Sequence, residues 1–108
     1  MRIDAIVMGS YVYMMGSRSG KALYIGVTNN LQRRIYEHKG DMIPGFTRHY
    51  QCHLLLYYEH YDNILTAIAR EKQLKGWTRQ RKEALIKTLN PNREDLAAEP
   101  SSFSAVAD

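Results

Sequence analysis

Residues 11–38 constrain the fold of this chain more than any other stretch. Two short runs rich in aromatic and β-branched residues, 11–15 and 22–27, flank a connection that contains glycine and serine. Such runs, bounded by glycine and serine, predict the two strands of a β-hairpin. Asn29 or Asn30 can then cap a helix that follows the second strand directly. The stretch therefore predicts strand, turn, strand and helix.

The helix expected over about 30–39 carries a basic pair on its core-facing side. One stripe follows the i, i+3, i+4, i+7 spacing and contains Leu31, Arg34, Ile35 and His38. We therefore expect Arg34 and His38 to face the sheet rather than open water, with Gly40 ending the helix. A guanidinium and an imidazole one turn apart can serve a phosphate. The alternative is a surface arginine and a hydrogen-bonded histidine with no further role.

The rest of the chain predicts one more strand and two more helices. Residues 54–59 form a continuous apolar run, which is typical of a central strand buried on both faces. Residues 40–53 predict an irregular loop, and helices are expected over about 63–76 and 78–89. The expected fold is therefore α+β, with a small central antiparallel sheet of about three strands flanked by helices.

Length and composition are those of one small domain. The chain has 108 residues and a formal net charge of +4, so a polyanionic partner is plausible, although a merely basic domain is the alternative. We expect a lead-in at 1–9, a domain at 10–96 and a disordered tail at 97–108.

Cysteine content and hydropathy predict a cytoplasmic protein. Cys52 is the only cysteine, which excludes an intramolecular disulfide and fits a reducing compartment. The chain has neither an apolar run of about 18 residues nor the apolar centre of a signal peptide near its start.

Glu71 is the residue that fits its surroundings least well. Its helix has an apolar face that consists of Ile64, Ala67, Ile68 and Leu74. Glu71 falls in the middle of that face, where a carboxylate is costly unless it is paired, hydrogen-bonded or bound to a metal ion. An ion pair with Arg34 or Lys75 is the alternative to a metal site.

Basic and aromatic residues are candidates for contacts with a nucleic acid, which needs cations for its phosphates and rings for its bases. The candidates are Lys21, Arg48, Tyr50, Arg79, Arg81 and Lys82. The alternative is an ordinary solvated loop and helix surface. We expect Trp77 to pack at a helix junction rather than to contact a base.

Several motifs together resemble the GIY-YIG nuclease family. They are Tyr11-Val12-Tyr13, Tyr24-Ile25-Gly26, Asn30-Leu31-x-x-Arg34-x-x-x-His38, and then Glu71 and Asn90. The second triplet matches the family name letter for letter, whereas Tyr11 replaces the glycine of the first and Val12 its isoleucine. The resemblance covers roughly 10–96. It is closest to the small stand-alone members, the URI domains, which are similar to the amino-terminal nuclease domain of the excinuclease C subunit.

The resemblance implies a DNA endonuclease that needs one divalent metal ion, Mg²⁺ or Mn²⁺, at Glu71. The implied catalytic residues are Tyr13, Tyr24, Arg34 and His38, and the implied supporting residues are Gly26 and Asn90, with Asn92 as the alternative to Asn90. Arg34 would stabilise charge on the phosphate. Either Tyr13 or His38 would activate the water, because a nearby cation favours phenolate but histidine has the more convenient ordinary pKa.

The expected partner is DNA, recognised by structure such as branches, flaps or single strands, in DNA repair or recombination; a protein partner is left open. A catalytically weak or inactive nucleic-acid-binding module of the same fold is the alternative, to which Tyr11 points. A zinc domain built on Cys52, His49, His53 and His60 is a third hypothesis, although their spacing matches no standard zinc site.

Overall fold

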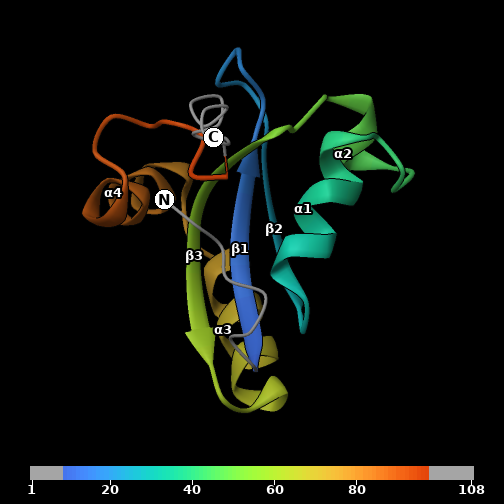
Figure 1. Ribbon diagram of the computed structural model, residues 1–108. Coiled ribbons are helices and arrows are strands. Elements are labelled where there is room, and N and C mark those ends of the chain that lie inside the picture. Colours follow the sequence, from blue (N-terminus) through green and yellow to red (C-terminus); the bar gives the residue numbers. More distant parts are fainter. Residues whose placement is uncertain (1–8, 98–108) are drawn as a thin grey trace, which may run out of the picture.

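The computed structural model describes residues 9–97, which form a three-stranded sheet and its surrounding helices (Figure 1). In chain order the elements are β1 (Ser10–Gly16), β2 (Leu23–Thr28), α1 (Leu31–Lys39), α2 (Phe46–His49), β3 (Leu54–Tyr61), α3 (Ile64–Lys75) and α4 (Arg79–Leu89). The strands pair antiparallel in the order β2-β1-β3, which confirms the expected α+β fold. The predictions for the lead-in and the tail fall, except at their inner ends, outside the described residues.

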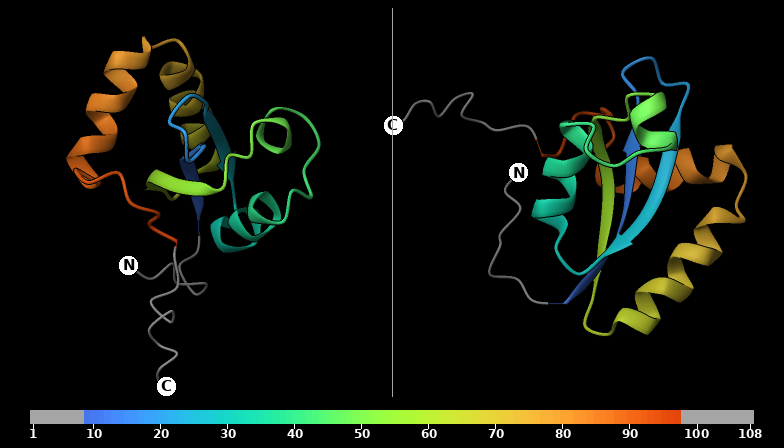
Figure 2. Two further views of the ribbon diagram at one scale, coloured as in Figure 1. Left: turned by 90° about the horizontal axis from the view of Figure 1, so that it is seen from above. Right: turned by 90° about the vertical axis from the view of Figure 1, so that its right-hand side faces the viewer.

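The central strand β1 is buried along its whole length because helices cover both faces of the sheet (Figure 2). Its residues alternate between two cores, as the pleat of a strand requires. Tyr11, Tyr13 and Met15 pack with α1 on one face. Val12 and Met14 pack with α3 and α4 on the other. The sheet thus separates an α1 side from an α3–α4 side.

The prediction that residues 54–59 form the central strand is wrong, because β3 lies at an edge of the sheet. The outer edge of β3 is covered by the segment that follows α4. The Leu96 amide donates to the Leu55 carbonyl at 2.8 Å, and the Leu55 amide donates to the Asp95 carboxylate at 3.1 Å. An edge strand that another segment shields from solvent can be as apolar as a central strand. The apolar run of β3 is therefore explained by the segment after α4 that covers it.

The helix boundaries follow the local signals. Asn30, Asn63 and Thr78 each accept a backbone amide at the start of α1, α3 and α4. Gly40 and Gly76 are the C-caps of α1 and α3.

The short helix α2 lies within the stretch expected to be an irregular loop. It has only four residues, which is too short to show helical periodicity in the sequence.

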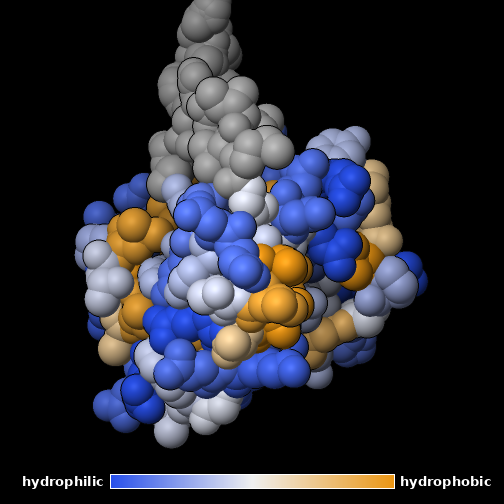
Figure 3. All heavy atoms as spheres, turned by 90° about the horizontal axis from the view of Figure 1, so that it is seen from below, coloured by the Kyte–Doolittle hydropathy of each residue, from blue (hydrophilic) through white to orange (hydrophobic). Residues whose placement is uncertain are grey.

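The end of the molecule where α3 begins carries exposed apolar side chains. Seen from that end, hydrophobic patches alternate with hydrophilic ones (Figure 3). Ile64 is 41% exposed and Leu65 is 71% exposed, so the prediction that Ile64 joins the core face of α3 is wrong. Ile64 lies in the first turn, near the end of the sheet, whereas Ala67 and Leu74 are buried. None of the helices within 9–97 has the length and hydropathy needed to span a membrane.

Candidate active site

A buried tyrosine–histidine pair forms the centre of the site. Tyr13 projects from β1 onto the α1 side, and His38 projects from α1 to meet it. The Tyr13 hydroxyl lies 2.8 Å from His38 Nε2, and both residues are 1% exposed. Tyr24 on β2 completes the group, with its ring centroid 5.5 Å from that of His38 and 6.2 Å from that of Tyr13. The structure therefore brings together three of the side chains that the motifs single out.

Burial keeps both members of this pair neutral. Desolvation lowers the pKa of His38 to about 4, and the positive charge of Arg34 acts in the same direction. Desolvation also raises the pKa of the Tyr13 phenol well above its usual range, with a further contribution from Tyr24, while Arg34 acts in the opposite direction. At neutral pH a neutral phenol therefore faces a neutral imidazole.

Thr47 orients this imidazole from its other side. His38 Nδ1 lies 3.2 Å from the hydroxyl of Thr47, which is 3% exposed and belongs to α2. When Nδ1–H donates to Thr47, Nε2 is left as an acceptor for the Tyr13 phenol. Sequence reasoning assigned Thr47 no role, because a single threonine in an expected loop carries no signal. Only the position of α2 reveals it.

Gly26 makes room for the Tyr13 ring. The two residues are register partners on β2 and β1. A Cβ atom at position 26 would lie 2.5 Å from the Tyr13 hydroxyl oxygen, closer than real Cβ atoms approach a neighbour. The expected supporting role of Gly26 therefore has a steric basis, since the phenol lies across a strand position that has no side chain.

Arg34 supplies positive charge beside the pair. Its Nη1 donates to Glu37 Oε1 at 3.2 Å, and the side chain is 38% exposed. Its positive charge acts to lower the pKa of both Tyr13 and His38. A partly exposed guanidinium in this position is able to contact a phosphate that approaches the phenol.

Glu71 lies on α3, and its negative charge affects the pKa of Tyr13 on β1. Its side chain is 14% exposed and pairs with Lys75 at 3.0 Å, which is the second of the two ion-pair partners expected from the sequence. Its negative charge contributes to the raised pKa of Tyr13. One carboxylate that is still partly open to solvent suits Mg²⁺, which keeps several waters and commonly uses one or two carboxylates.

The zinc hypothesis finds no support. Over residues 9–97, no three His, Cys, Asp or Glu side chains gather as a metal site would require. Cys52 is buried in the core, and His53 Nε2 pairs with Asp41 at 2.8 Å.

Asn90 supports the fold rather than the reacting groups. It is 4% exposed, and its amide donates to the Leu56 carbonyl at 3.0 Å and to the Glu94 carbonyl at 2.8 Å. Its Oδ1 accepts the Glu94 amide at 2.9 Å. These bonds hold the turn after α4 against β3. Asn92, the alternative, is exposed in that turn.

The nucleic-acid candidates divide between the two sides of the sheet. Arg48 and Tyr50 belong to α2 and its C-cap, on the same side as the tyrosine–histidine pair. The other helical candidates lie on α4, which covers the opposite side (Figure 2), and are Arg79, Arg81 and Lys82.

Two of the α4 candidates take part in packing. Arg79 donates to the carbonyl of Gly20 at 2.7 Å and to that of Lys21 at 3.2 Å, which attaches α4 to the hairpin turn. The Arg81 guanidinium lies 4.0 Å from the centre of the Trp77 ring, which packs at the junction of α3 and α4 as expected. The structure does not bring these residues to Tyr13.

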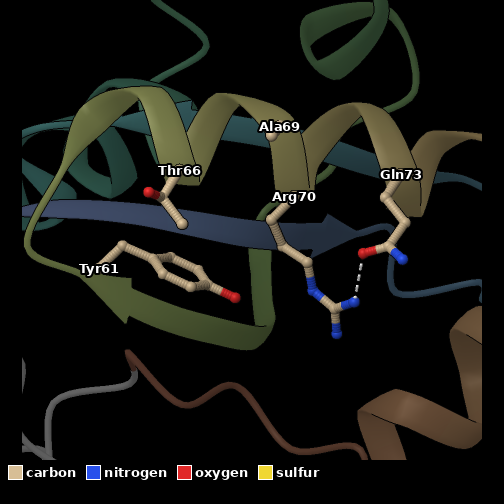
Figure 4. Close-up of a pocket in the computed structure, with 5 residues that line it drawn as sticks. All are labelled: Tyr61, Thr66, Ala69, Arg70 and Gln73. Carbon is tan, nitrogen blue, oxygen red and sulfur yellow. Dashed lines mark hydrogen bonds between the residues drawn. The ribbon is translucent and has the colours of Figure 1, made fainter.

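A hollow on the α3 side of the sheet is lined in part by polar residues whose hydrogen bonds are already made within the fold. It has a volume of about 490 Å³ and lies between β3 and α3 (Figure 4). It is lined by Tyr61, Thr66, Ala69, Arg70 and Gln73. Arg70 donates to Gln73 at 2.7 Å and binds both carboxylate oxygens of Glu59 at 2.9 Å. Its guanidinium is therefore held within the fold.

Known proteins share this sequence pattern and fold. The model of the GIY-YIG catalytic domain matches residues 9–84. A UPF0213 protein of Clostridium perfringens is 33% identical over 90 residues, which are 83% of this chain and 96% of the relative. A UPF0213 protein of Syntrophus aciditrophicus is 35% identical over 85 residues, which are 78% of this chain and 95% of the relative.

A solved structure has the same fold. The solution NMR structure of a UPF0213 protein from Bacillus halodurans superposes with a TM-score of 0.53 at 23% identity, covering 94% of this chain and 100% of the other. Together with the motifs on β1, β2 and α1, these matches show that the chain belongs to the GIY-YIG family, a family of nucleases, and within it to the UPF0213 proteins.

Proposed function

We propose that this protein is a metal-dependent endonuclease that hydrolyses phosphodiester bonds in DNA. The observation that carries the proposal is the buried hydrogen bond of 2.8 Å between Tyr13 and His38, with Arg34 beside it. A neutral phenol held against a neutral imidazole is a proton-transfer pair, and the adjacent guanidinium suits a phosphate. Membership of a nuclease family supports the same reaction.

Tyr13 and His38 are assigned one proton relay. The phenol oxygen takes a proton from the attacking water as its own proton passes to His38 Nε2. The resulting hydroxide oxygen bonds to phosphorus, the bond from phosphorus to the leaving oxygen breaks, and the leaving oxygen takes up a proton from solvent water. The proton on His38 Nε2 then returns through the Tyr13 phenol to solvent, which restores the neutral pair. Thr47 keeps Nε2 available by accepting from Nδ1–H. In this proposal Tyr13 and His38 act together as the base, and the hydrogen bond of 2.8 Å between them supports that assignment.

Arg34 and Glu71 are assigned the electrostatic roles, which are to stabilise the phosphate and to hold a metal ion. Arg34 contacts the non-bridging oxygens of the phosphate as negative charge accumulates on them. Glu71 would hold one Mg²⁺ or Mn²⁺ ion, which when bound supplies Lewis-acid stabilisation of the phosphate. Lys75 would give up its ion pair with Glu71 or share that carboxylate.

The alternative is a binding module of the same fold without catalysis, suggested by Tyr11 in place of the family glycine. Tyr11 is 6% exposed and packs edge-on against Tyr58 with ring centroids 6.2 Å apart. It belongs to the same core as Tyr13 but adds bulk rather than removing a reacting group. This packing accommodates Tyr11 without displacing Tyr13 or His38, which remain in contact, so Tyr11 by itself is no argument against the enzyme. A role in DNA repair or recombination is part of the proposal, as is a preference for branched, flap or single-stranded DNA.

The test is cleavage of labelled single-stranded, duplex, flap and branched DNA with Mg²⁺, Mn²⁺ or EDTA. Wild type is compared with Glu71→Gln and Tyr13→Phe, and we expect each variant to lower the rate by about 100-fold or more. The matched controls are Glu94→Gln and Tyr36→Phe, which alter an exposed carboxylate and an exposed phenol. Circular dichroism verifies that every variant is folded.

Metal-dependent cleavage that is lost in both site variants and retained in both controls supports the proposal. Binding without cleavage of every DNA in the panel points to the non-catalytic module. Cleavage that survives Glu71→Gln shows that the metal site has been assigned incorrectly.

A further inference from the structure

The aromatic rings do not stop at the tyrosine–histidine pair but continue outward over α2. The ring of Tyr24 is stacked with that of Phe46 at 6.3 Å between centroids and an interplanar angle of 29°. The ring of Phe46 lies 4.8 Å from that of Tyr50, which lies 4.6 Å from that of His49. A continuous series of rings therefore joins the site to the surface.

The outer members of this series are open to solvent. Phe46 is 46% exposed and Tyr50 is 50% exposed, although both are large hydrophobic residues. They border a hollow of about 590 Å³ that Gly45, Phe46, Arg48, His49 and Tyr50 line. We call these five residues the α2 platform. It combines exposed ring faces with a guanidinium.

The α2 platform is held in a defined position relative to Tyr13. Thr47, between Phe46 and Arg48, points inward and contacts His38 Nδ1 at 3.2 Å, while its neighbours on both sides are exposed. The same short helix thus presents rings outward and orients the imidazole inward. A ligand bound to the platform is therefore held at a fixed position relative to Tyr13 and His38.

The chemistry of the platform favours unpaired nucleotides. Bases of any sequence stack on aromatic side chains, and an arginine beside them binds the backbone phosphate. In a duplex each base face is covered by its neighbours, so only the base edges in the grooves remain available to protein side chains. Phe46 and Tyr50 offer faces, which match the faces of unpaired bases, and the net charge of +4 suits a polyanion.

We propose that the α2 platform binds the unpaired nucleotides beside the scissile phosphate, so that the substrate is single-stranded DNA or a single-stranded segment within a larger DNA. Bases stack on Phe46 and Tyr50, and Arg48 contacts the phosphate between them. This inference rests on the proposed nuclease function and gives that site its substrate class. The selectivity is for strand state rather than for sequence, because stacking accepts every base.

The test measures binding separately from cleavage. Fluorescence anisotropy in EDTA compares a labelled single strand with a hairpin duplex of the same base composition. We expect wild type to prefer the single strand, and Phe46→Ala and Tyr50→Ala each to weaken its binding by about five-fold or more. Duplex binding should change by less than about two-fold, since rings that receive no base contribute little to it. Tyr36→Ala, which removes an exposed tyrosine on α1, is the matched control and should match wild type.

A second measurement reports the stacking itself. The base analogue 2-aminopurine is placed at successive positions of the single strand, and its fluorescence is quenched where it stacks. Quenching that is lost in Phe46→Ala and is not recovered in Phe46→Leu supports a stacked base. Full recovery of affinity and quenching in Phe46→Leu would overturn the stacking, because leucine restores bulk without a ring.

The two proposals fail in different ways. Equal affinity of wild type for single strand and duplex, or undiminished single-strand affinity in both Phe46→Ala and Tyr50→Ala, overturns the platform even if DNA is cleaved. A single-strand preference that depends on these rings, without cleavage in Mg²⁺ or Mn²⁺, supports the platform and rejects the nuclease.

Discussion

His38 makes the stability of this fold depend on pH in a defined direction. Burial lowers its pKa in the folded protein to about 4, whereas an unfolded chain holds histidine near its ordinary pKa of about 6.5. The unfolded state therefore binds a proton in the interval between these values, and the folded state does not. The stability that depends on neutral His38 is present above about pH 6.5 and is lost as the pH falls toward 4.

The magnitude follows from the difference between the two pKa values. That difference, at 1.36 kcal/mol per pKa unit, gives a loss of about 3 kcal/mol between pH 7.5 and pH 4. The residue is 1% exposed, so solvent screening does not reduce the figure greatly. The slope should be steepest near pH 5, at a little over 1 kcal/mol per pH unit or about one proton per molecule.

The assay is urea denaturation at a series of pH values for wild type and for His38→Gln, which retains a side-chain hydrogen bond but does not titrate. Other groups titrate over the same range. Burial raises the pKa of Glu59, but hydrogen bonds from Arg70 and two tyrosines outweigh this effect and lower it overall. Hydrogen bonds from Arg93 and Arg79 lower the pKa of Glu83, although burial opposes them. Both contributions are common to the two proteins and cancel in the comparison.

The expected result is a wild-type curve that falls by about 3 kcal/mol more than the variant curve on acidification. Parallel curves would refute the reasoning, because they would mean that folded His38 takes up a proton as readily as unfolded histidine does. The buried phenol–imidazole contact would then tolerate a charged ring, and burial would not be what keeps His38 neutral.

Three further predictions concern positions around the site. Gly26→Ala should displace the Tyr13 hydroxyl, destabilise the fold by about 1–3 kcal/mol and lower the cleavage rate. Gly76→Ala, where a Cβ meets only ordinary contacts, should have none of these effects. Thermal unfolding and cleavage rates of the two variants test this prediction. Thr47→Val should lower kcat by about 10-fold and change its pH profile, whereas Thr47→Ser should restore both, and an unchanged profile in the valine variant would contradict the tautomer assignment. Asn90→Ala should cost about 2–3 kcal/mol of unfolding free energy in urea titration without a specific effect on KM, and a loss below about 0.5 kcal/mol would show that its three hydrogen bonds are dispensable.

Features that depend on residues close together in the sequence were predicted correctly. The hairpin follows from two strand-forming runs around a glycine-containing turn. The three long helices begin directly after Asn30, Asn63 and Thr78, because each of these residues caps the amides that follow it. The inward position of His38 follows from helical spacing alone, since side chains at i, i+3, i+4 and i+7 share one face.

The order of the strands was not local information. The continuous apolar run of β3 suggested a central strand, but the contacts that cover its outer edge come from residues some 40 positions later. A run of leucines indicates only that a strand is shielded from solvent. It does not indicate which part of the chain shields it, because that depends on packing between segments far apart in the sequence.

The candidate site divides in the same way. The sequence by itself determined which groups are present, because the two triplets, the helix motif and a carboxylate on an apolar face are all legible as patterns. The tertiary structure alone decided that Thr47 orients His38, that Gly26 accommodates the Tyr13 phenol, and that the α2 platform joins Tyr24 through Phe46. The physical reason is that these contacts join segments with no shared periodicity or capping pattern. They exist only once α1 and α2 have packed on the same side of the sheet as Tyr13 and Tyr24.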